Sequence, residues 1–252
     1  MKSSWKGRIY MTEKCSDPRL LDVEENYKRI ADRVAQAAVR SGRQPEDVSL
    51  LAATKTVQPE YINHAIACGL RFVGENRVQE LLEKYERLDL DRGVSCQMIG
   101  RLQTNKVKYI VDKVDCIQSV DSVKLAGEIS RLSERIGRRM PVLVEVNIGE
   151  ESNKGGVLPE KLYEFLAEIS AFPGIQIEGL MAIPPICAEK TELCNYFSRM
   201  KQYFIDIGAK KIDNVSMDCL SMGMSSDYEE AILCGATMVR VGSALFGQRI
   251  YP

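Results

Sequence analysis

The chain has 252 residues, 45% hydrophobic and 27% charged, so it can bury a sizeable core and has the usual length of a single α/β barrel. Its 34 basic and 35 acidic side chains give a net charge of -1, which offers no electrostatic basis for a nucleic-acid or membrane partner. The eight cysteines include no Cys-x-x-Cys pair, and His64 is the single histidine, so the spacing of a metal site is absent. We therefore expect reduced cysteines in the core and no metal.

The N-terminal segment does not have the pattern of a signal peptide. Residues 1–14 are polar and lack its apolar region, residues 1–16 show no periodicity, and no apolar run in the chain approaches a bilayer span. We expect residues 1–16 to form a flexible tail and residues 17–252 to form one domain, in the cytoplasm.

A long amphipathic helix is predicted to follow the tail. Asp17 and Pro18 supply a cap and a first-turn proline, and Ser41-Gly42 ends the helix. Between them, one apolar stripe is formed by Leu20, Val23, Tyr27, Ile30, Val34 and Ala38. Because this helix precedes the first strand, it is an extra element that must bury its stripe against the sheet or barrel that follows.

From Val48 onward the chain alternates short apolar runs with amphipathic segments, which is typical of repeated βα units. Eight strands are predicted, at residues 48–55, 71–75, 95–100, 115–119, 141–148, 175–183, 215–222 and 237–242. Seven helical segments are predicted between them, near residues 59–68, 77–86, 103–112, 122–137, 159–171, 189–207 and 227–234.

These elements predict a single-domain (β/α)8 TIM barrel. Seven helices after eight strands leave one helix missing, and the N-terminal helix is available to close the ring beside the last strand. A doubly wound open sheet is the alternative. However, its Gly-x-Gly-x-x-Gly fingerprint does not follow the first strand, and no Walker-type phosphate loop is present.

The first strand ends in a lysine. Residues 48–54 form a nearly continuous apolar run, as in a strand buried on both faces, and Lys55 follows at its C-terminal end, where barrels carry their chemistry. A desolvated lysine there becomes a nucleophile able to form a Schiff base with a carbonyl. The alternative is a surface lysine that ends a strand.

Two pairs of small residues follow the last two strands. Ser225-Ser226 and Gly242-Ser243 lie where barrels commonly bind a phosphate through backbone N–H groups. Each pair alone is consistent with a tight turn. Together, at these positions, they favour phosphate binding.

Arg240 lies near the end of the eighth strand. An arginine pointing into a barrel is either the partner of a buried carboxylate, such as Glu145 or Glu178, or the partner of a pyridine nitrogen opposite a Schiff-base lysine. Because an arginine there keeps its proton, the ring nitrogen is expected to stay unprotonated and the cofactor to be a weak electron sink.

A lysine after strand one, phosphate loops after strands seven and eight, and an arginine on the last strand resemble the pyridoxal 5'-phosphate (PLP) barrel of alanine racemase. More closely, the chain resembles the family of PLP homeostasis proteins, also called proline synthetase co-transcribed homologues. The resemblance runs from about residue 20 to the C-terminus. Its segments are Ala53-Thr54-Lys55, Gly74-Glu75-Asn76, Ile99-Gly100, Leu102-Gln103, Asn105-Lys106, Gly179-Leu180-Met181, Ser221–Ser225 with Asp227, and Val239-Arg240 with Gly242.

The resemblance implies that Lys55 holds PLP as a Schiff base and that Arg240 faces the pyridine nitrogen. It also implies that the phosphate is held by Ser225, Ser226, Gly242 and Ser243, and that Asn76 and Met222 lie near the ring. Two positions depart from the family's pattern. Gln97 replaces a common histidine, and Arg101 stands where a small residue or histidine is common, so the rim after strand three is expected to differ in charge.

The resemblance therefore implies a monomeric, non-enzymatic protein that stores, buffers or delivers PLP, with PLP-dependent apoenzymes as possible recipients. The rival is a PLP-dependent racemase or related enzyme. Racemisation needs acid/base groups on both faces of the intermediate, and Lys55 serves one. The larger racemases bring the opposing tyrosine from a further C-terminal domain, for which we expect no room after Ser243. A third interpretation of the sequence is an interaction protein that uses the barrel as a binding platform.

Overall fold

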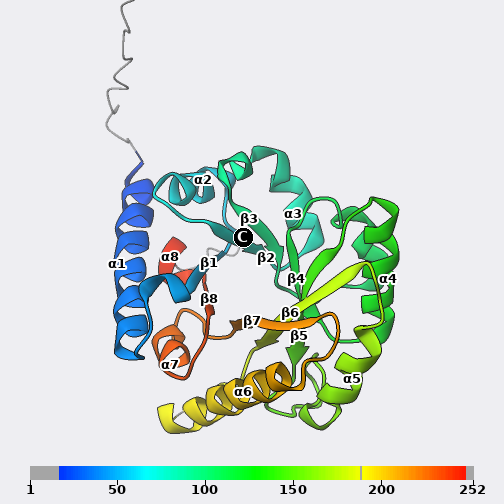
Figure 1. Ribbon diagram of the computed structural model, residues 1–252. Helices are drawn as coiled ribbons and strands as arrows, with labels where there is room; N and C mark the ends of the chain where they lie inside the picture. Colours follow the sequence, from blue (N-terminus) through cyan, green and yellow to red (C-terminus); the bar gives the residue numbers. More distant parts are fainter. Residues whose placement is uncertain (1–16, 188, 248–252) are drawn as a thin grey trace, which may run out of the picture.

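The computed structural model describes residues 17–187 and 189–247, so the predicted tail at residues 1–16 lies outside the described residues. Eight parallel strands form a closed barrel in the order β1 to β8, and helices surround it (Figure 1). This confirms the predicted barrel and excludes the open sheet. The strands are β1 (Ser49–Ala53), β2 (Phe72–Glu75), β3 (Ser95–Met98), β4 (Cys116–Val120), β5 (Met140–Val146), β6 (Ile175–Ala182), β7 (Val215–Ser221) and β8 (Met238–Val241).

All seven predicted helical segments between the strands are present. They are α2 (Pro59–Ala67), α3 (Val78–Lys84), the 3₁₀ helix η4 (Thr104–Tyr109), α4 (Val123–Arg135), η5 (Pro159–Lys161) continuing into α5 (Leu162–Ile169), α6 (Lys190–Lys210) and α7 (Tyr228–Leu233). The pattern did not predict the 3₁₀ turns η1 (Pro45–Asp47), η2 (Tyr85–Arg87) and η3 (Leu90–Arg92), or the short α8 (Ser243–Phe246). One turn of helix is too short to show a hydrophobic period.

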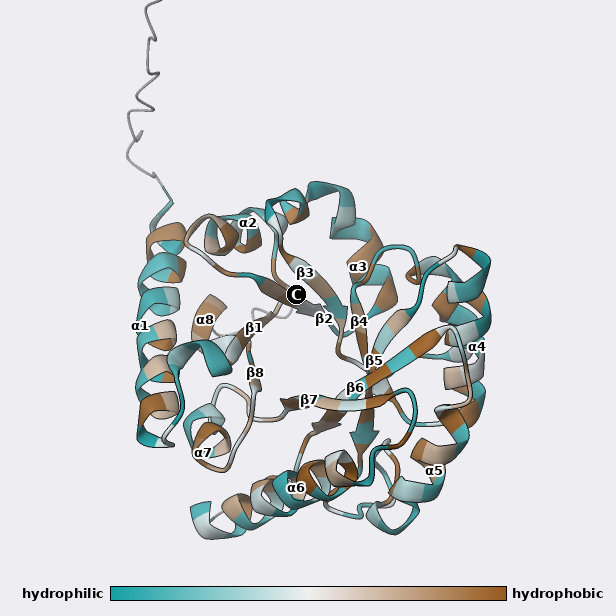
Figure 2. Ribbon diagram, viewed as in Figure 1, coloured by the Kyte–Doolittle hydropathy of each residue, from teal (hydrophilic) through white to brown (hydrophobic). Residues whose placement is uncertain are grey.

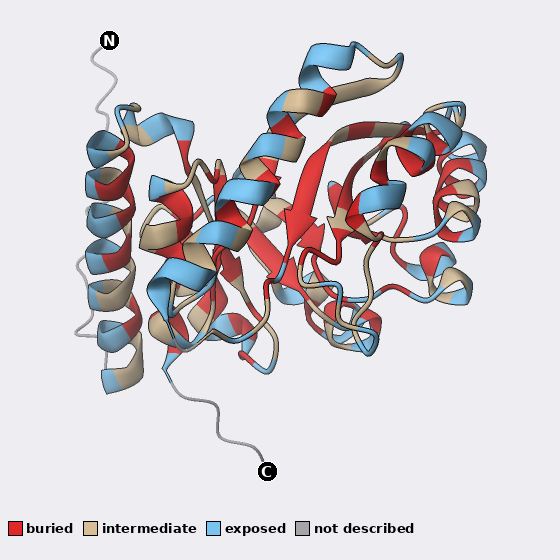
Figure 3. Cartoon of the chain, turned by 90° about the horizontal axis from the view of Figure 1, so that it is seen from below, coloured by how far each residue is buried: buried red, intermediate tan, exposed pale blue. Residues whose placement is uncertain are grey.

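The extra N-terminal helix is α1 (Pro18–Arg40), and its cap is the predicted one: the Asp17 side chain accepts a hydrogen bond from the Arg19 N–H at 2.9 Å. The buried face of α1 consists of Val23, Ile30, Val34, Ala37 and Ala38. It packs on α2, α7 and α8, and in Figure 3 its inner side is buried while its outer side is exposed. Helix α1 therefore closes the ring beside the first and last strands, as predicted.

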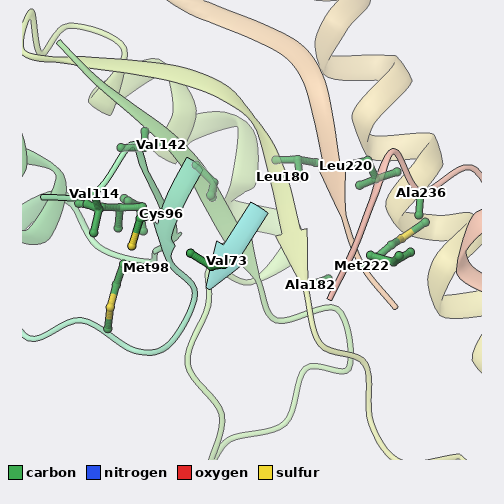
Figure 4. Close-up of a cluster of buried hydrophobic side chains, with 14 of the residues drawn as sticks. Val73, Cys96, Met98, Val114, Val142, Leu180, Ala182, Leu220, Met222 and Ala236 are labelled. Atoms are coloured by element: carbon green, nitrogen blue, oxygen red, sulfur yellow. The ribbon is translucent and has the colours of Figure 1, made fainter. Parts of the chain in front are cut away.

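The barrel wall separates two kinds of core. Outward-facing residues and the inner faces of the helices form one large apolar cluster, part of which is drawn in Figure 4. The helices accordingly carry both hydrophobic and hydrophilic residues (Figure 2). Inside the barrel lie two small clusters, one of Leu51, Ile99 and Met238 and one of Cys116, Leu143 and Met181. Among the described helices, none is long and apolar enough to cross a membrane.

Strand β1 closes the barrel by pairing with β8. The register aligns Ser49 with Met238, Leu51 with Arg240 and Ala52 with Val241. Successive side chains of a strand point to opposite faces. Since Leu51 and Met238 lie in the inner cluster, while Ala52, Val239 and Val241 lie in the outer one, Arg240 falls on an inward position.

Replacing Ile30 by alanine is expected to lower the free energy of unfolding by about 2–5 kcal/mol, because Ile30 is buried where α1 meets the barrel. Urea unfolding of the ligand-free protein measures this. The matched control is Val39→Ala on the same helix, where Val39 is 60% exposed and the expected change is within about 0.5 kcal/mol. Equal effects of the two substitutions would mean that α1 does not contribute to the core as described.

Candidate functional site

The predicted site residues lie at the carboxyl ends of neighbouring strands. Ala53 and Gly74 face the barrel interior: Ala53 packs against the inner cluster, and a Cβ built at Gly74 would lie 2.6 Å from the Leu51 side chain. Continuing the alternation puts positions 55 and 76, like 240, on the inward side. A Cβ built at Gly242 would lie 3.1 Å from the carbonyl oxygen of Ala53, so the ends of β1 and β8 meet. The fold therefore brings Lys55, Asn76, Arg240 and Gly242 to one mouth.

The segment around Lys55 is held from behind the barrel wall. Thr54 faces outward, and its Oγ1 donates to Glu75 Oε1 at 2.6 Å. Lys84 Nζ, from α3, donates to the Thr54 carbonyl at 2.9 Å and to Glu75 Oε1 at 2.7 Å. Burial raises the pKa of Glu75, and the Lys84 charge opposes that rise. A buried ion pair thus fixes the residue directly before Lys55.

The residue after Lys55 is fixed from the same helix. Thr56 has a φ of 62°, in the left-handed region that a threonine rarely adopts. Its N–H donates to Glu80 Oε2 at 2.7 Å, and Lys84 Nζ lies 3.5 Å from the same oxygen. Lys55 itself is partly buried. Both of its neighbours are therefore tied down, which restricts the directions in which its ammonium group can point.

Arg240 is fully enclosed and is oriented by a chain of hydrogen bonds across the barrel interior. Its Nη1 donates to Ser221 Oγ at 2.7 Å, and Ser221 Oγ donates to Gln118 Oε1 at 2.7 Å. Gln118 Nε2 then donates to Gln97 Oε1 at 2.6 Å, and Gln97 Nε2 donates to Ser95 Oγ at 3.1 Å. A second guanidinium nitrogen, Nη2, donates to the Ala182 carbonyl at 3.0 Å. The chain runs from β8 to β3 and fixes the guanidinium plane.

Neither carboxylate considered from the sequence forms an ion pair with Arg240 within the described part of the chain. Burial lowers the pKa of Arg240 to about 10, which leaves it charged at neutral pH. Burial also raises the pKa of Glu145, and Asp121 raises it further, while Arg240 and Arg101 oppose the rise. Glu145 therefore acts on Arg240 at a longer range than an ion pair, and the direct acceptors of the guanidinium group are the neutral oxygens of Ser221 and Ala182.

The two small-residue loops are joined to each other. Ser225 Oγ accepts hydrogen bonds from the N–H groups of Gly242, at 3.1 Å, and Ala244, at 3.3 Å. Ser226 and Ser243 are exposed. Gly223, at the start of the first loop, has a φ of 90°, and a Cβ there would lie 2.5 Å from Ala231 Cβ, so only glycine is accommodated. The loops after β7 and β8 thus form one unit of hydroxyl and N–H groups.

Asn76 and Met222 occupy different faces of the wall. Asn76 Oδ1 is buried without a hydrogen-bond partner among the described residues. The loop after β3 closes on it, because a Cβ at Gly100 would lie 2.3 Å from the Asn76 carbonyl oxygen. The Met222 side chain instead belongs to the outer cluster and lies beside Ala236 (Figure 4). Any contact of Met222 with a ligand in the barrel mouth must therefore come from its main chain.

These residues fit a phosphorylated pyridine aldehyde. The mouth offers an amine on β1, an oriented guanidinium on β8, and hydroxyl and N–H donors on the joined loops. The unpartnered Asn76 Oδ1 is an acceptor that a bound group can satisfy, since buried polar atoms are normally paired. The donor set thus matches a carbonyl, a ring nitrogen and a phosphate.

A cavity of about 350 Å³ lies at the opposite end of the barrel, at the starts of the strands. Acidic side chains line part of it: Asp47, Asp115, Glu178 and Asp218. Repulsion from these carboxylates disfavours a phosphate there, whereas the mouth carries Lys55 and Arg240. The mouth is therefore the candidate site, as is usual for barrels of this class.

Sequence reasoning missed the supporting residues Gln118, Glu80 and Lys84, and it gave no role to Ser221. Gln118 and Ser221 have a signal of their own, since each is a buried polar residue at an inward position of its strand. The Gln97 substitution, noted as a departure from the family, places an amide in the chain that orients Arg240. Arg101 is exposed at the rim, consistent with the expected change in charge there.

Comparison with known proteins agrees with this geometry. The family model for the alanine racemase N-terminal domain matches residues 23–250. The PLP homeostasis protein of Aquifex aeolicus is 44% identical over 228 residues, covering 90% of this chain and 98% of the relative. The protein of the same name from Escherichia coli K12 is 36% identical over 236 residues, covering 91% and 98%. The chain belongs to the PLP homeostasis protein family.

Solved structures of similar chains have the same fold. PipY of Synechococcus elongatus with PLP bound is 34% identical, with a TM-score of 0.74, and the match covers 86% of this chain and all of PipY. Alanine racemase of Corynebacterium glutamicum is 16% identical with a TM-score of 0.66, and the match covers 91% of this chain and 61% of the racemase. At that identity the racemase shares the fold alone.

Glu145 provides a test of the electrostatics of the barrel interior. Because burial raises its pKa above the value in the unfolded chain, folding favours the protonated carboxyl group. The penalty is absent below the unfolded pKa of about 4.3 and grows as the pH rises through the raised pKa. Glu145→Gln should therefore gain stability relative to the unmodified protein as the pH rises from about 4 to about 7, measured by urea unfolding without ligand.

The matched control is Glu160→Gln, at an exposed glutamate, which should show no such pH-dependent gain. A stability difference for Glu145→Gln that does not change with pH would contradict the assignment of a buried, destabilised carboxylate at this position.

Proposed function

We propose that this protein binds PLP in the barrel mouth, as a Schiff base on Lys55, and takes part in PLP homeostasis by storing, buffering or delivering the cofactor. The observation that carries the proposal is the meeting of the β1 and β8 ends. It sets Lys55, an oriented Arg240 and the joined Ser225–Gly242 loops around one opening. Relatives of this family carry the corresponding name.

The residues of the chain have distinct roles in this proposal. PLP supplies an aldehyde that an amine can capture and a ring that can accept electrons. Lys55 supplies the amine, and its fixed neighbours Thr54 and Thr56 aim it. Arg240 keeps a proton that it does not give up, so it donates to a ring nitrogen and leaves that nitrogen unprotonated. Ser225, Ser226, Gly242 and Ser243 supply phosphate donors.

We further propose that the protein is a carrier and not an efficient enzyme. The fold shared with alanine racemase leaves catalysis open, so the case rests on the site. An unprotonated ring stabilises a carbanion poorly, and Lys55 offers acid/base chemistry on one face only. The alternative, a PLP-dependent racemase or related enzyme, requires a second base on the other face.

The proposal extends to the protein's surroundings. We propose that the protein is a monomer in the cytoplasm and passes PLP to PLP-dependent apoenzymes. This role requires no nucleic-acid or membrane partner. The seven cysteines among the described residues are all free thiols, which supports a reducing compartment.

Borohydride reduction of the PLP-loaded protein should place a pyridoxyl adduct on Lys55, because that amine alone stands at the inward end of β1. Peptide mass mapping reads this out. Lys55→Ala should abolish the Schiff-base absorption in the visible region, whereas Lys154→Ala, at the loop after β5, should retain it. A pyridoxyl group on Lys154 or Lys106 in the unmodified protein would refute the assignment.

The phosphate loops are expected to provide much of the affinity. Pyridoxal, which lacks the phosphate, should bind at least about tenfold more weakly than PLP, since each charged hydrogen bond contributes about 1.5–3 kcal/mol. Fluorescence titration measures both. Ser225→Ala should weaken PLP binding but leave pyridoxal binding unchanged, because Ser225 organises the Gly242 and Ala244 N–H groups. Equal losses for both ligands would place Ser225 outside the phosphate site.

Amino acids mixed with the PLP-loaded protein in deuterated water should exchange their α-protons at well below about 1 per second, the lower end of ordinary enzyme turnover. NMR follows the exchange. Arg240→Glu should raise the rate if ring electronics are the main limit, and Arg240→Lys serves as the charge-retaining control. Racemisation by the unmodified protein at ordinary enzyme rates would overturn the carrier proposal.

A further inference from the structure

A second cluster of reactive side chains lies away from the barrel mouth, between α1 and α2. It consists of Glu24 on α1 and of His64 and Cys68 on α2, and their ligand atoms all lie within 4.8 Å of one another. His64 Nε2 lies 3.6 Å from Glu24 Oε2. All three side chains are partly buried. Carboxylate, imidazole and thiol are three of the common ligand types for transition metals.

The local fold explains why these groups meet. His64 lies in the last turn of α2 and Cys68 is its C-cap, and the Cys68 N–H donates to the His64 carbonyl at 3.0 Å. Residues one turn apart share a helix face. Helix α1 packs directly on α2, as Figure 1 shows, and Tyr61 Oη donates to Asp17 at 3.0 Å near the start of α1. The pairing of these two helices presents Glu24 to the His64–Cys68 face.

The hydrogen bonding of the cluster is incomplete. His64 Nε2 is buried and has no hydrogen-bond partner among the described residues, because 3.6 Å to Glu24 is too long for a hydrogen bond. Lys28 Nζ occupies the other Glu24 oxygen, Oε1, at 2.6 Å. The second oxygen, Glu24 Oε2, is therefore left facing His64. A simple ion pair between Glu24 and His64 would be expected to close this gap, so the arrangement suits an additional group between the two atoms.

We propose that Glu24 Oε2, His64 Nε2 and Cys68 Sγ bind a divalent cation of the zinc type. A nitrogen and an oxygen bound to a tetrahedral zinc ion, at about 2.0–2.1 Å and 2.0–2.2 Å, lie roughly 3.3–3.5 Å apart, and the 3.6 Å between His64 Nε2 and Glu24 Oε2 is only slightly longer. A set with one thiol and one imidazole selects Zn²⁺ or Co²⁺ over Mg²⁺ and Ca²⁺, which prefer oxygen ligands. Three protein ligands leave the fourth position open to water.

Binding changes the protonation of the site. The Cys68 thiol loses its proton to solvent as the sulfur–metal bond forms, while the ionised Glu24 carboxylate and the neutral imidazole bind directly. Burial raises the pKa of Cys68, and Glu24 raises it further while Lys28 lowers it, so the metal must displace a firmly held proton. Affinity should therefore increase with pH.

The metal would tie α1 to α2. Helix α2 begins at Pro59, just after the segment that carries Lys55, and α1 closes the barrel ring. A cation that binds only the folded chain stabilises it, and the stabilisation grows with metal concentration. The sequence pattern missed this cluster because Glu24 comes from a different helix and only the pair His64–Cys68 lies close in sequence.

The test uses the full-length, PLP-loaded protein, reduced and freed of metal. Added Zn²⁺ should protect Cys68 from alkylation by iodoacetamide, as read by peptide mass mapping, but it should not protect Cys187, which is also partly buried. Co²⁺ should give a thiolate charge-transfer band and visible bands of tetrahedral cobalt, saturating at one ion per chain. Zn²⁺ should also raise the midpoint of thermal unfolding.

His64→Gln and Cys68→Ser should each weaken Zn²⁺ binding at least ~100-fold, since loss of groups that merely support a ligand costs about 10–100-fold. Cys187→Ser is the matched control and should bind like the unmodified protein. All four proteins should keep the visible PLP absorption, which verifies folding. Unprotected Cys68 in the unmodified protein at saturating Zn²⁺, or undiminished binding after His64→Gln, would overturn the proposal.

Discussion

The pairing of β1 with β8 is the constraint on which the site depends. Those strands are the first and last of the barrel, and their register sets Leu51 opposite Arg240 and Ala52 opposite Val241. A shift of one residue would turn Arg240 into the outer apolar cluster and Val241 into the barrel. It would also separate the end of β1, which leads to Lys55, from the loop at Gly242. The strand pairing that closes the barrel therefore also assembles the site, and α1 packs beside these two strands.

A second constraint is the cost of burying a guanidinium group. Arg240 has no carboxylate within ion-pair distance in the described chain, so neutral oxygens of Ser221 and Ala182 stabilise its charge. The acceptor on Ser221 is itself oriented, because its hydroxyl proton goes to Gln118, and Gln118 is oriented by Gln97. Loss of any one residue of this hydrogen-bonded chain would leave a buried polar atom of its neighbour without a partner. This dependence makes Gln97, which lies on the far side of the barrel, part of the support for Arg240.

The barrel itself could be predicted from the sequence, because strands buried on both faces read as apolar runs and each is followed by an amphipathic helix. Lys55 and Arg240 could be predicted for the same reason: each is charged at the end of such a run. The Thr54–Glu75–Lys84 ion-pair cluster could not, since Lys84 belongs to α3 and only the packing of that helix brings its ammonium to the Thr54 carbonyl. Met222 illustrates the same limit. Resemblance places it near the ring, whereas its side chain faces away from the interior.

The alternation of a strand explains why the binding segments mix residues of different kinds. In Thr54-Lys55 and in Glu75-Asn76 the second residue falls on the inward side and the first on the outward side. The outward residues pair with each other through the 2.6 Å hydrogen bond from Thr54 to Glu75, and Lys84 closes the pair from α3. In each pair, the inward residue is therefore placed to contact a ligand, and the outward residue makes the barrel wall rigid. A substitution at Thr54 or Glu75 would change the aim of Lys55 or Asn76 without touching a ligand, so the binding function of this mouth extends into the layer behind it.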